Sequence, residues 1–200
     1  MSTASDQIPT KSRQMAFVID LRRCIGCDTC VLGCKVENDV SSGKSRLKVL
    51  DSGGDAIDER PRGTYPNISQ YWVPTMCHHC ADAPCVRVCP TTALWRRDED
   101  GLVMLDKDKC VGCRRCEEAC PYDALSFDDD VGTADKCNFC EHRIAQGQGP
   151  ACGLVCPTRA ILFGDILDPD ATVNRLLATR EHKILRASSG AKPQIYYLEP

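Results

Sequence analysis

Hydrophobic positions along the chain form short segments that alternate with polar turns. Strand-like segments are predicted over residues 16–20, 92–95, 101–106, 160–163 and 195–198. A polar turn at residues 98–101 joins the second and third of these segments. A short helix is predicted over residues 173–177, with Asp170 as its polar cap. The pattern indicates an α+β architecture of small antiparallel strands and short helices with long loops.

The segments between these elements are less regular. Residues 41–66 are rich in glycine, serine and charge, and they are predicted to form a surface loop. Residues 195–198 are predicted as a terminal strand or an extended tail, which either follows the protein's own surface or carries Tyr196 and Tyr197 to a partner. No run of 18 or more uncharged apolar residues occurs, so no helix of this chain is expected to span a membrane.

The apolar core implied by the composition is thin. Hydrophobic residues make up 42% of the 200 residues, but that figure includes 16 cysteines, and only 6% of residues are aromatic. Something besides apolar burial is therefore expected to hold the chain together. The formal net charge of −3 excludes a basic nucleic-acid binder and an acidic disordered tail.

All sixteen cysteines fall into four quartets, numbered I to IV here in chain order. The quartets are Cys24, Cys27, Cys30 and Cys34; Cys77, Cys80, Cys85 and Cys89; Cys110, Cys113, Cys116 and Cys120; and Cys137, Cys140, Cys152 and Cys156. Quartets I and III are spaced C-x2-C-x2-C-x3-C, quartet II C-x2-C-x4-C-x3-C, and quartet IV C-x2-C-x11-C-x3-C. Proline follows the last cysteine of quartets II, III and IV. Lys35 stands at that place in quartet I, so the first helix is expected to run on through Val36 and Asn38.

This spacing separates three uses of cysteine: disulfides, structural zinc and iron–sulfur clusters. Disulfides suit a secreted chain, but residues 1–14 are polar and lack an apolar signal segment, and no apolar segment follows Arg22-Arg23. Zinc sites with four cysteines pair two CxxC knuckles across a longer gap. Three cysteines two residues apart, followed by a fourth and a proline, are typical of [4Fe–4S] binding. The sequence therefore predicts four [4Fe–4S] clusters with all sixteen cysteines as iron ligands.

In two-cluster ferredoxins the fourth cysteine of a motif ligates the other cluster of the pair. This rule predicts four crossed ligand sets, whereas the alternative is that each quartet binds its own cluster. The crossed sets are Cys24, Cys27, Cys30 and Cys156 for cluster 1; Cys34, Cys137, Cys140 and Cys152 for cluster 2; Cys77, Cys80, Cys85 and Cys120 for cluster 3; and Cys89, Cys110, Cys113 and Cys116 for cluster 4.

The pairing implies two ferredoxin-like units, one inserted in the other. Residues 15–50 and 135–170 would form the outer unit with quartets I and IV, and residues 67–134 the inserted unit with quartets II and III. Residues 171–200 would add a C-terminal helix and an extended tail.

Beyond the quartets, several stretches resemble one known family. They are residues 63–66 with 71–94, residues 136–143, and residues 190–198. Together with the cysteine spacing they resemble the four-cluster iron–sulfur subunits of molybdopterin oxidoreductases of the dimethyl sulfoxide reductase family. The polysulfide, thiosulfate, arsenate and tetrathionate reductase type is the most similar.

The resemblance implies an electron-transfer subunit that has no catalytic residues or substrate site of its own. Its partners would be a large catalytic subunit with a molybdenum or tungsten bis-pterin cofactor and a quinone-reactive membrane-anchor subunit or another redox partner. An iron–sulfur subunit of a formate dehydrogenase or hydrogenase assembly is the alternative, and a zinc-binding adaptor is a third reading. The chain would associate with a membrane through its partners, on the periplasmic side by co-export or on the cytoplasmic side.

Charged and histidine side chains beside the cysteines are candidates for tuning cluster potentials, which respond to charge and to hydrogen bonds to sulfur. His78 and His79 lie inside quartet II, where four cysteines already complete the motif. Lys136 lies next to quartet IV and either offsets the negative charge of a cluster or is an ordinary surface lysine.

Overall fold

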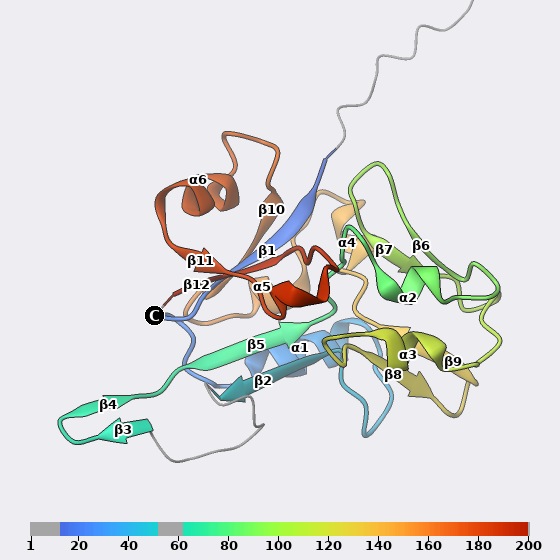
Figure 1. Cartoon of the computed structure of the whole chain (residues 1–200), viewed down its shortest axis with the longest axis horizontal. Helices are drawn as coiled ribbons and strands as arrows, with labels where there is room; N and C mark the ends of the chain where they lie inside the picture. The colour runs from blue at the N-terminus through green and yellow to red at the C-terminus, as the bar shows by residue number, and fades with distance from the viewer. Residues whose placement is uncertain (1–12, 52–61, 200) are drawn as a thin grey trace, which may run out of the picture.

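The computed structural model describes residues 13–51 and 62–199. At its centre is a four-stranded sheet in the order β10-β1-β12-β11. The strands are β1 (Met15–Asp20), β10 (Ile161–Asp165), β11 (His182–Lys183) and β12 (Ile195–Leu198). β1 runs antiparallel to β10 and parallel to β12, which brings both ends of the described chain into one sheet (Figure 1).

The sheet is covered on both faces, because all six residues of β1 are buried. Helix α6 (Thr172–Thr179) packs against β10 and β1 through Val173, which is 1% exposed. A Cβ atom added at Gly164 of β10 would lie 2.9 Å from a Val173 methyl group, so glycine permits this close contact.

The remaining strands form four antiparallel two-stranded ribbons. They are β2 (Leu47–Asp51) with β5 (Trp72–Met76), β3 (Arg62–Thr64) with β4 (Asn67–Ser69), β6 (Leu94–Arg96) with β7 (Val103–Leu105), and β8 (Leu125–Asp128) with β9 (Thr133–Lys136). The β3–β4 hairpin projects from the body as an arm (Figure 1).

The other helices are short and begin in or beside a cysteine motif. They are α1 (Thr29–Glu37), α2 (Pro84–Arg87), α3 (Arg115–Ala119), α4 (Glu141–Ile144) and α5 (Ala151–Leu154), with a further 3₁₀ turn, η1 (Ala187–Ser189). Helices this short are not stable alone in water, so their neighbours must hold them. α1 contacts α5 and α2 contacts α3, which places quartet I beside quartet IV and quartet II beside quartet III.

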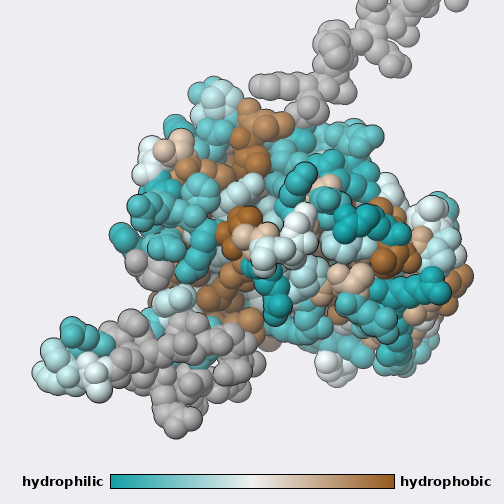
Figure 2. All heavy atoms as spheres, viewed as in Figure 1, coloured by the Kyte–Doolittle hydropathy of each residue, from teal (hydrophilic) through white to brown (hydrophobic). Residues whose placement is uncertain are grey.

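Cysteines form a large part of the apolar core. One cluster of buried residues surrounds Phe17, Phe139 and Tyr197 and includes Cys34 and Cys137. A second surrounds Leu94 and Val103 and includes Cys80, Cys85 and Cys116. The surface seen in Figure 2 is mostly hydrophilic, with separate hydrophobic patches. Within the described residues, the longest helices are too short and too polar to cross a membrane.

The structure confirms the strands predicted over residues 16–20, 92–95, 101–106, 160–163 and 195–198, with small shifts of their ends. Helix α1 runs past Cys34 to Glu37, as the absence of proline predicts, and Asn38 is its C-terminal cap. The small antiparallel ribbons and short helices agree with a ferredoxin-like iron–sulfur fold.

Two details of the sequence interpretation are wrong. The predicted loop over residues 41–66 contains β2 and β3, while its residues 52–61 lie outside the described residues. β2 is a strand because it pairs with β5, a partner that lies beyond the loop and gives no local signal. Asp170 does not cap α6, which begins after Ala171 without a side-chain cap. Among the strands that the structure describes, one pair, β1 with β12, is parallel, and the other pairs are antiparallel.

The C-terminal segment is an interior strand of the central sheet. Tyr197 is fully buried, and its hydroxyl donates a hydrogen bond to the Pro74 carbonyl at 3.0 Å. Of the two alternatives for this segment, the structure therefore selects packing on the protein itself.

Candidate iron–sulfur sites

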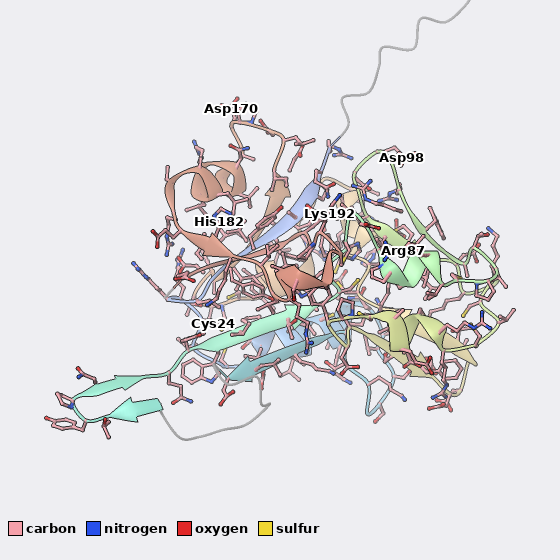
Figure 3. All side chains as sticks on the ribbon, viewed as in Figure 1. Cys24, Arg87, Asp98, Asp170, His182 and Lys192 are labelled. Carbon is pink, nitrogen blue, oxygen red and sulfur yellow. The ribbon has the colours of Figure 1, made fainter. Side chains whose placement is uncertain are left out.

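All sixteen cysteine thiols are free, so none takes part in a disulfide. Nine are buried, and only Cys27 and Cys113 are exposed. In the view of Figure 3, Cys24 of quartet I and Arg87 within quartet II are separated along the long axis of the molecule. The thiols are thus spread through the body of the protein.

Two pockets each collect thiols from two quartets. One is lined by Cys24, Cys27 and Cys30 of quartet I together with Cys156 of quartet IV. The other is lined by Cys110, Cys113 and Cys116 of quartet III together with Cys89 of quartet II. These are the groupings predicted for clusters 1 and 4.

The thiols predicted for cluster 2 are close enough to influence one another's ionisation. Burial raises the pKa of Cys152, and the nearby Cys137, Cys140 and Cys34 raise it further. Burial likewise raises the pKa of Cys34 to about 11, and Cys140 contributes to this shift.

The thiols predicted for cluster 3 behave in the same way. Burial raises the pKa of Cys80 to about 12, with further contributions from Cys77, Cys85 and Cys120. Four thiolates at one buried place repel each other, and a cationic iron core removes that cost. The donor sets therefore fit [4Fe–4S] clusters.

Within residues 13–51 and 62–199, no group of three or more histidine, cysteine or acidic side chains is placed to hold a single metal ion.

The fourth cysteine of quartets II and IV receives hydrogen bonds from the chain that follows it. Burial raises the pKa of Cys156, but hydrogen bonds from Thr158, Ala160 and Ile161 outweigh it, and the pKa is lowered. The Ala160 N–H lies 3.2 Å from the Cys156 sulfur. The pKa of Cys89 is lowered in the same way: hydrogen bonds from Leu94, Thr91 and Ala93 outweigh its burial.

Proline explains this arrangement, because it ends the helical turn and folds the next residues back over the sulfur. Cys120, which Pro121 follows, also receives backbone hydrogen bonds from Ala124 and Tyr122. Burial is the larger effect at Cys120, and its pKa is raised. No proline follows Cys34, and its sulfur accepts a hydrogen bond from the side-chain amide of Asn38 instead.

Buried polar side chains lie between quartets II and IV. Lys136 is 3% exposed, and its ammonium donates to the carbonyls of Val103 and Cys137. The alternative of an ordinary surface lysine is therefore excluded. Its positive charge lowers the pKa values of Cys85 and Cys137 against the larger effect of burial.

His79 is fully buried and bridges two parts of the chain. Its Nδ1 accepts a hydrogen bond from the Val103 N–H at 2.9 Å, and its Nε2 donates to the Cys137 carbonyl at 3.0 Å. Burial lowers the pKa of His79 well below its ordinary value, so the ring is neutral. His78 is also buried and stacks on Tyr122 at 3.8 Å between ring centres. Both histidines are packing and hydrogen-bonding residues of the core.

Three residues beside the predicted cluster 2 are absent from the sequence-based candidates. They are Asn38, Arg46 and Asp135, which form one hydrogen-bonded chain that ends at two cysteine sulfurs. Asn38 has a local signal, because it lies four residues after Cys34 on a helix that lacks the proline. Arg46 and Asp135 are brought together from distant segments and have none.

Comparison with known proteins agrees with this geometry. A family model described as a 4Fe-4S dicluster domain matches residues 68–166. The thiosulfate reductase electron transfer subunit PhsB of Salmonella typhi is 41% identical over 90% of each chain. The arsenate respiratory reductase iron-sulfur subunit ArrB of a Shewanella species is 32% identical over 92% of this chain and 96% of its own length. A putative dimethyl sulfoxide reductase iron-sulfur subunit of Halobacterium salinarum is 42% identical over 91% of this chain and 78% of its own length.

The thiol sets and the ferredoxin-like fold define an iron–sulfur protein whose sixteen cysteines fit four [4Fe–4S] clusters. This protein belongs to the family of electron-transfer iron–sulfur subunits of molybdopterin oxidoreductases related to dimethyl sulfoxide reductase. The predicted cofactor and the predicted electron-transfer role are confirmed, and the family favours a reductase over the formate dehydrogenase or hydrogenase alternative.

Proposed function

We propose that this chain conducts single electrons between a catalytic subunit that holds a molybdenum or tungsten bis-pterin cofactor and a quinone-reactive membrane subunit or another redox partner. Each [4Fe–4S] cluster supplies a one-electron centre whose potential depends on charge, hydrogen bonds to sulfur and solvent exposure. The chain's own residues hold these centres in place, limit their contact with water and adjust their surroundings. The observation that carries the proposal is that all sixteen thiols are free and that two pockets are each lined by four of them, drawn from two quartets.

The ligand sets we propose are crossed between quartets. Cluster 1 would take Cys24, Cys27, Cys30 and Cys156; cluster 2 Cys34, Cys137, Cys140 and Cys152; cluster 3 Cys77, Cys80, Cys85 and Cys120; and cluster 4 Cys89, Cys110, Cys113 and Cys116. The mixed lining of two pockets supports this assignment. The contacts of α1 with α5 and of α2 with α3 support it as well.

The same contacts support an architecture of two ferredoxin-like units, with residues 67–134 inserted between residues 15–50 and 135–170. In this arrangement Cys34 and Cys156 fasten the two halves of the outer unit to each other. Residues 171–200 would complete the central sheet of the outer unit through β12, which lies beside β1.

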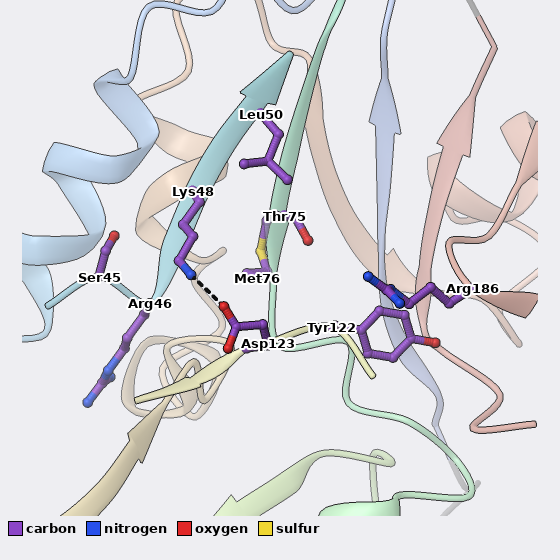
Figure 4. Close-up of a pocket in the computed structure, with 10 residues that line it drawn as sticks. Ser45, Arg46, Lys48, Leu50, Thr75, Met76, Tyr122, Asp123 and Arg186 are labelled. Carbon is purple, nitrogen blue, oxygen red and sulfur yellow. Dashed lines mark hydrogen bonds and ion pairs between the residues drawn. The ribbon is translucent and has the colours of Figure 1, made fainter. Parts of the chain in front are cut away.

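Substrate chemistry in this proposal belongs to the catalytic partner, because the cofactor that performs it is bound there. A surface pocket between β5 and the Tyr122 turn has no cysteine in its lining, and an ion pair between Lys48 and Asp123 at 3.1 Å crosses it (Figure 4). Of the exposed apolar residues, four lie on α1 and around α5: Leu32, Val36, Leu154 and Val155. A partner subunit would cover residues of this kind.

The experiment that tests the proposal is isolation of the intact complex through a tag on this chain, followed by metal analysis. We expect about 16 iron atoms and about 16 acid-labile sulfides per chain, and molybdenum or tungsten in a large co-purifying subunit. Zinc without iron would overturn the cluster reading. Recovery with a hydrogenase subunit and without molybdenum or tungsten would overturn the choice of partner.

Association with a membrane through an anchor subunit is part of the same proposal. Fractionation of cells should place this chain with the membranes, and deletion of the anchor subunit should release it. Protease access to intact and to permeabilised cells would then assign the chain to the periplasmic or the cytoplasmic side.

A further inference from the structure

Helix α1 continues for about one turn beyond Cys34 to Glu37, and Asn38 is its C-terminal cap. Lys35, in place of a proline, allows this continuation, and its ammonium donates to the Lys44 carbonyl at 2.6 Å. The Asn38 backbone N–H and its side-chain Nδ2 both donate to the Cys34 carbonyl, at 3.1 and 3.0 Å. The extra turn therefore holds the Asn38 side chain in contact with the Cys34 thiol.

The same Nδ2 atom lies 3.7 Å from the Cys34 sulfur and 3.6 Å from the Cys140 sulfur. A primary amide has two N–H donors. One is taken by the Cys34 carbonyl, and the other faces two sulfurs that come from quartets I and IV. Asn38 is thus a donor shared by two thiols that the sequence separates by more than a hundred residues.

Arg46 determines which end of the amide faces the sulfurs. Its Nη1 donates to Asn38 Oδ1 at 3.1 Å, so the oxygen must point to Arg46 and the nitrogen to the thiols. Arg46 is itself held by Asp135, which accepts from Nε and from Nη2, both at 2.6 Å. The two side chains of this ion pair are 11% and 10% exposed, so the two-point contact between guanidinium and carboxylate is rigid and largely shielded from water.

Negative charge on these sulfurs increases when a cluster accepts an electron, and a hydrogen-bond donor stabilises the more negative state. We propose that Asn38 raises the reduction potential of the cluster held by Cys34, Cys137, Cys140 and Cys152 by donating its amide to two of the ligand sulfurs, and that Arg46 is a positioning residue for that amide. The inference rests on the ligand set proposed above for cluster 2.

The test is a redox titration, monitored by electron paramagnetic resonance, of the cluster-loaded full chain in its complex. The signal of cluster 2 is identified as the one altered by Cys152→Ser. We expect Asn38→Leu to shift the one-electron equilibrium of that signal about tenfold toward the oxidised state, a decrease of about 59 mV. The other three potentials should stay unchanged. A potential of cluster 2 equal to that of the unmodified chain would overturn the role of Asn38.

Asn174→Leu is the matched control, because it removes an amide that donates to the Ile166 carbonyl in the α6 region. We expect it to leave all four potentials unchanged, and a shift of the cluster 2 signal equal to that of Asn38→Leu would overturn the inference. If Asn38→Leu does not load clusters, Asn38→Asp keeps the shape of the side chain and replaces the donor by an anion. It should lower the cluster 2 potential further, and an unchanged or raised potential would contradict the proposal.

The positioning role of Arg46 is tested with Arg46→Lys, which keeps the charge but loses the planar fork that holds Asp135 and Asn38 together. We expect a lower potential of cluster 2 in this variant and no additional decrease when it is combined with Asn38→Leu. An equal decrease in both backgrounds would show that Arg46 acts independently of Asn38. Lys48→Met is the control: it removes a half-exposed cation two residues away, and Arg46 points away from its ion pair (Figure 4).

A comparison of Cys34→Ser with Cys152→Ser separates this inference from the ligand set on which it depends. If Cys34→Ser and Cys152→Ser alter different signals, the ligand set is wrong. If they alter the same signal and Asn38→Leu leaves its potential unchanged, the ligand set stands and the inference about Asn38 fails.

Discussion

Cys34 and Cys156 are both fourth cysteines of their quartets, yet their sulfurs are surrounded in different ways. Pro157 follows Cys156, and the next residues of the chain supply the hydrogen bonds, including the Ala160 N–H at 3.2 Å. Lys35 follows Cys34, the helix continues, and the donor is the amide of Asn38. The Cys156 sulfur accepts hydrogen bonds from backbone N–H groups that follow it directly in the chain. The Cys34 sulfur instead faces the Asn38 side chain, which Arg46 holds from a distant segment.

Because of this difference, the regions around Cys34 and Cys156 should differ in their sensitivity to mutation. Backbone donors remain whichever side chains are present, provided that the proline turn forms. The donor at Cys34 depends on Arg46 and Asp135, which lie in separate segments of the chain. Substitutions in the network should therefore have larger effects than substitutions after Pro157.

The largest effect is expected from Asp135→Ala. It leaves Arg46 buried without its carboxylate, and breaking a buried ion pair typically costs about 3–5 kcal/mol. Asp123→Ala is the control, because it removes an exposed partner of Lys48, which contributes about 0–1 kcal/mol. The measurement is the urea concentration at which half of the visible cluster absorbance is lost. Equal midpoints for the two variants would contradict the importance of the network.

The second-largest effect is expected from Lys35→Pro. This variant places a proline after the fourth cysteine of quartet I, as in the other quartets, but here the position lies inside helix α1. Proline in a helix interior costs about 3 kcal/mol and would remove the last turn that carries Asn38. We expect a lower urea midpoint and a lowered or lost cluster 2 signal. Lys35→Ala keeps the helix and should have a small effect. If Lys35→Pro and Lys35→Ala have the same urea midpoint and the same cluster 2 signal, the continued helix is dispensable.

The smallest effect is expected from Thr158→Val in the Cys156 region. It removes a hydroxyl 3.6 Å from the Cys156 sulfur and leaves the backbone donors in place. The potential of cluster 1 should fall by clearly less than Asn38→Leu lowers that of cluster 2, as measured in the same redox titration. If Thr158→Val lowers the potential of cluster 1 by more than Asn38→Leu lowers that of cluster 2, the expected difference between the two regions is wrong.

The same contrast explains what the sequence can and cannot predict. The four quartets, the cofactor and the run of α1 past Cys34 follow from the spacing of cysteines and from one missing proline. Strands such as β1 and β10 follow from short apolar segments with polar turns around them. All of these features are encoded within a few neighbouring residues.

Features that depend on distant partners escape a local interpretation. The sequence predicts a loop where β2 lies, because the strand character of β2 comes from pairing with β5. The ion pair of Arg46 with Asp135 joins residues from separate segments of the chain, and nothing in either local sequence indicates it. The sequence leaves two roles open for Lys136, because its burial follows from the packing of other segments around it.

In the assignment that we propose, Cys34 of quartet I ligates the cluster of quartet IV, and Cys156 of quartet IV ligates the cluster of quartet I. The most direct test of this assignment is the spectrum of the cluster-loaded chain in four variants: Cys24→Ser, Cys140→Ser, Cys34→Ser and Cys156→Ser. We expect that Cys156→Ser alters the same resonance signal as Cys24→Ser, and that Cys34→Ser alters the same signal as Cys140→Ser. If Cys156→Ser instead alters the signal of Cys140→Ser, and Cys34→Ser that of Cys24→Ser, each quartet binds its own cluster and the crossed assignment is wrong.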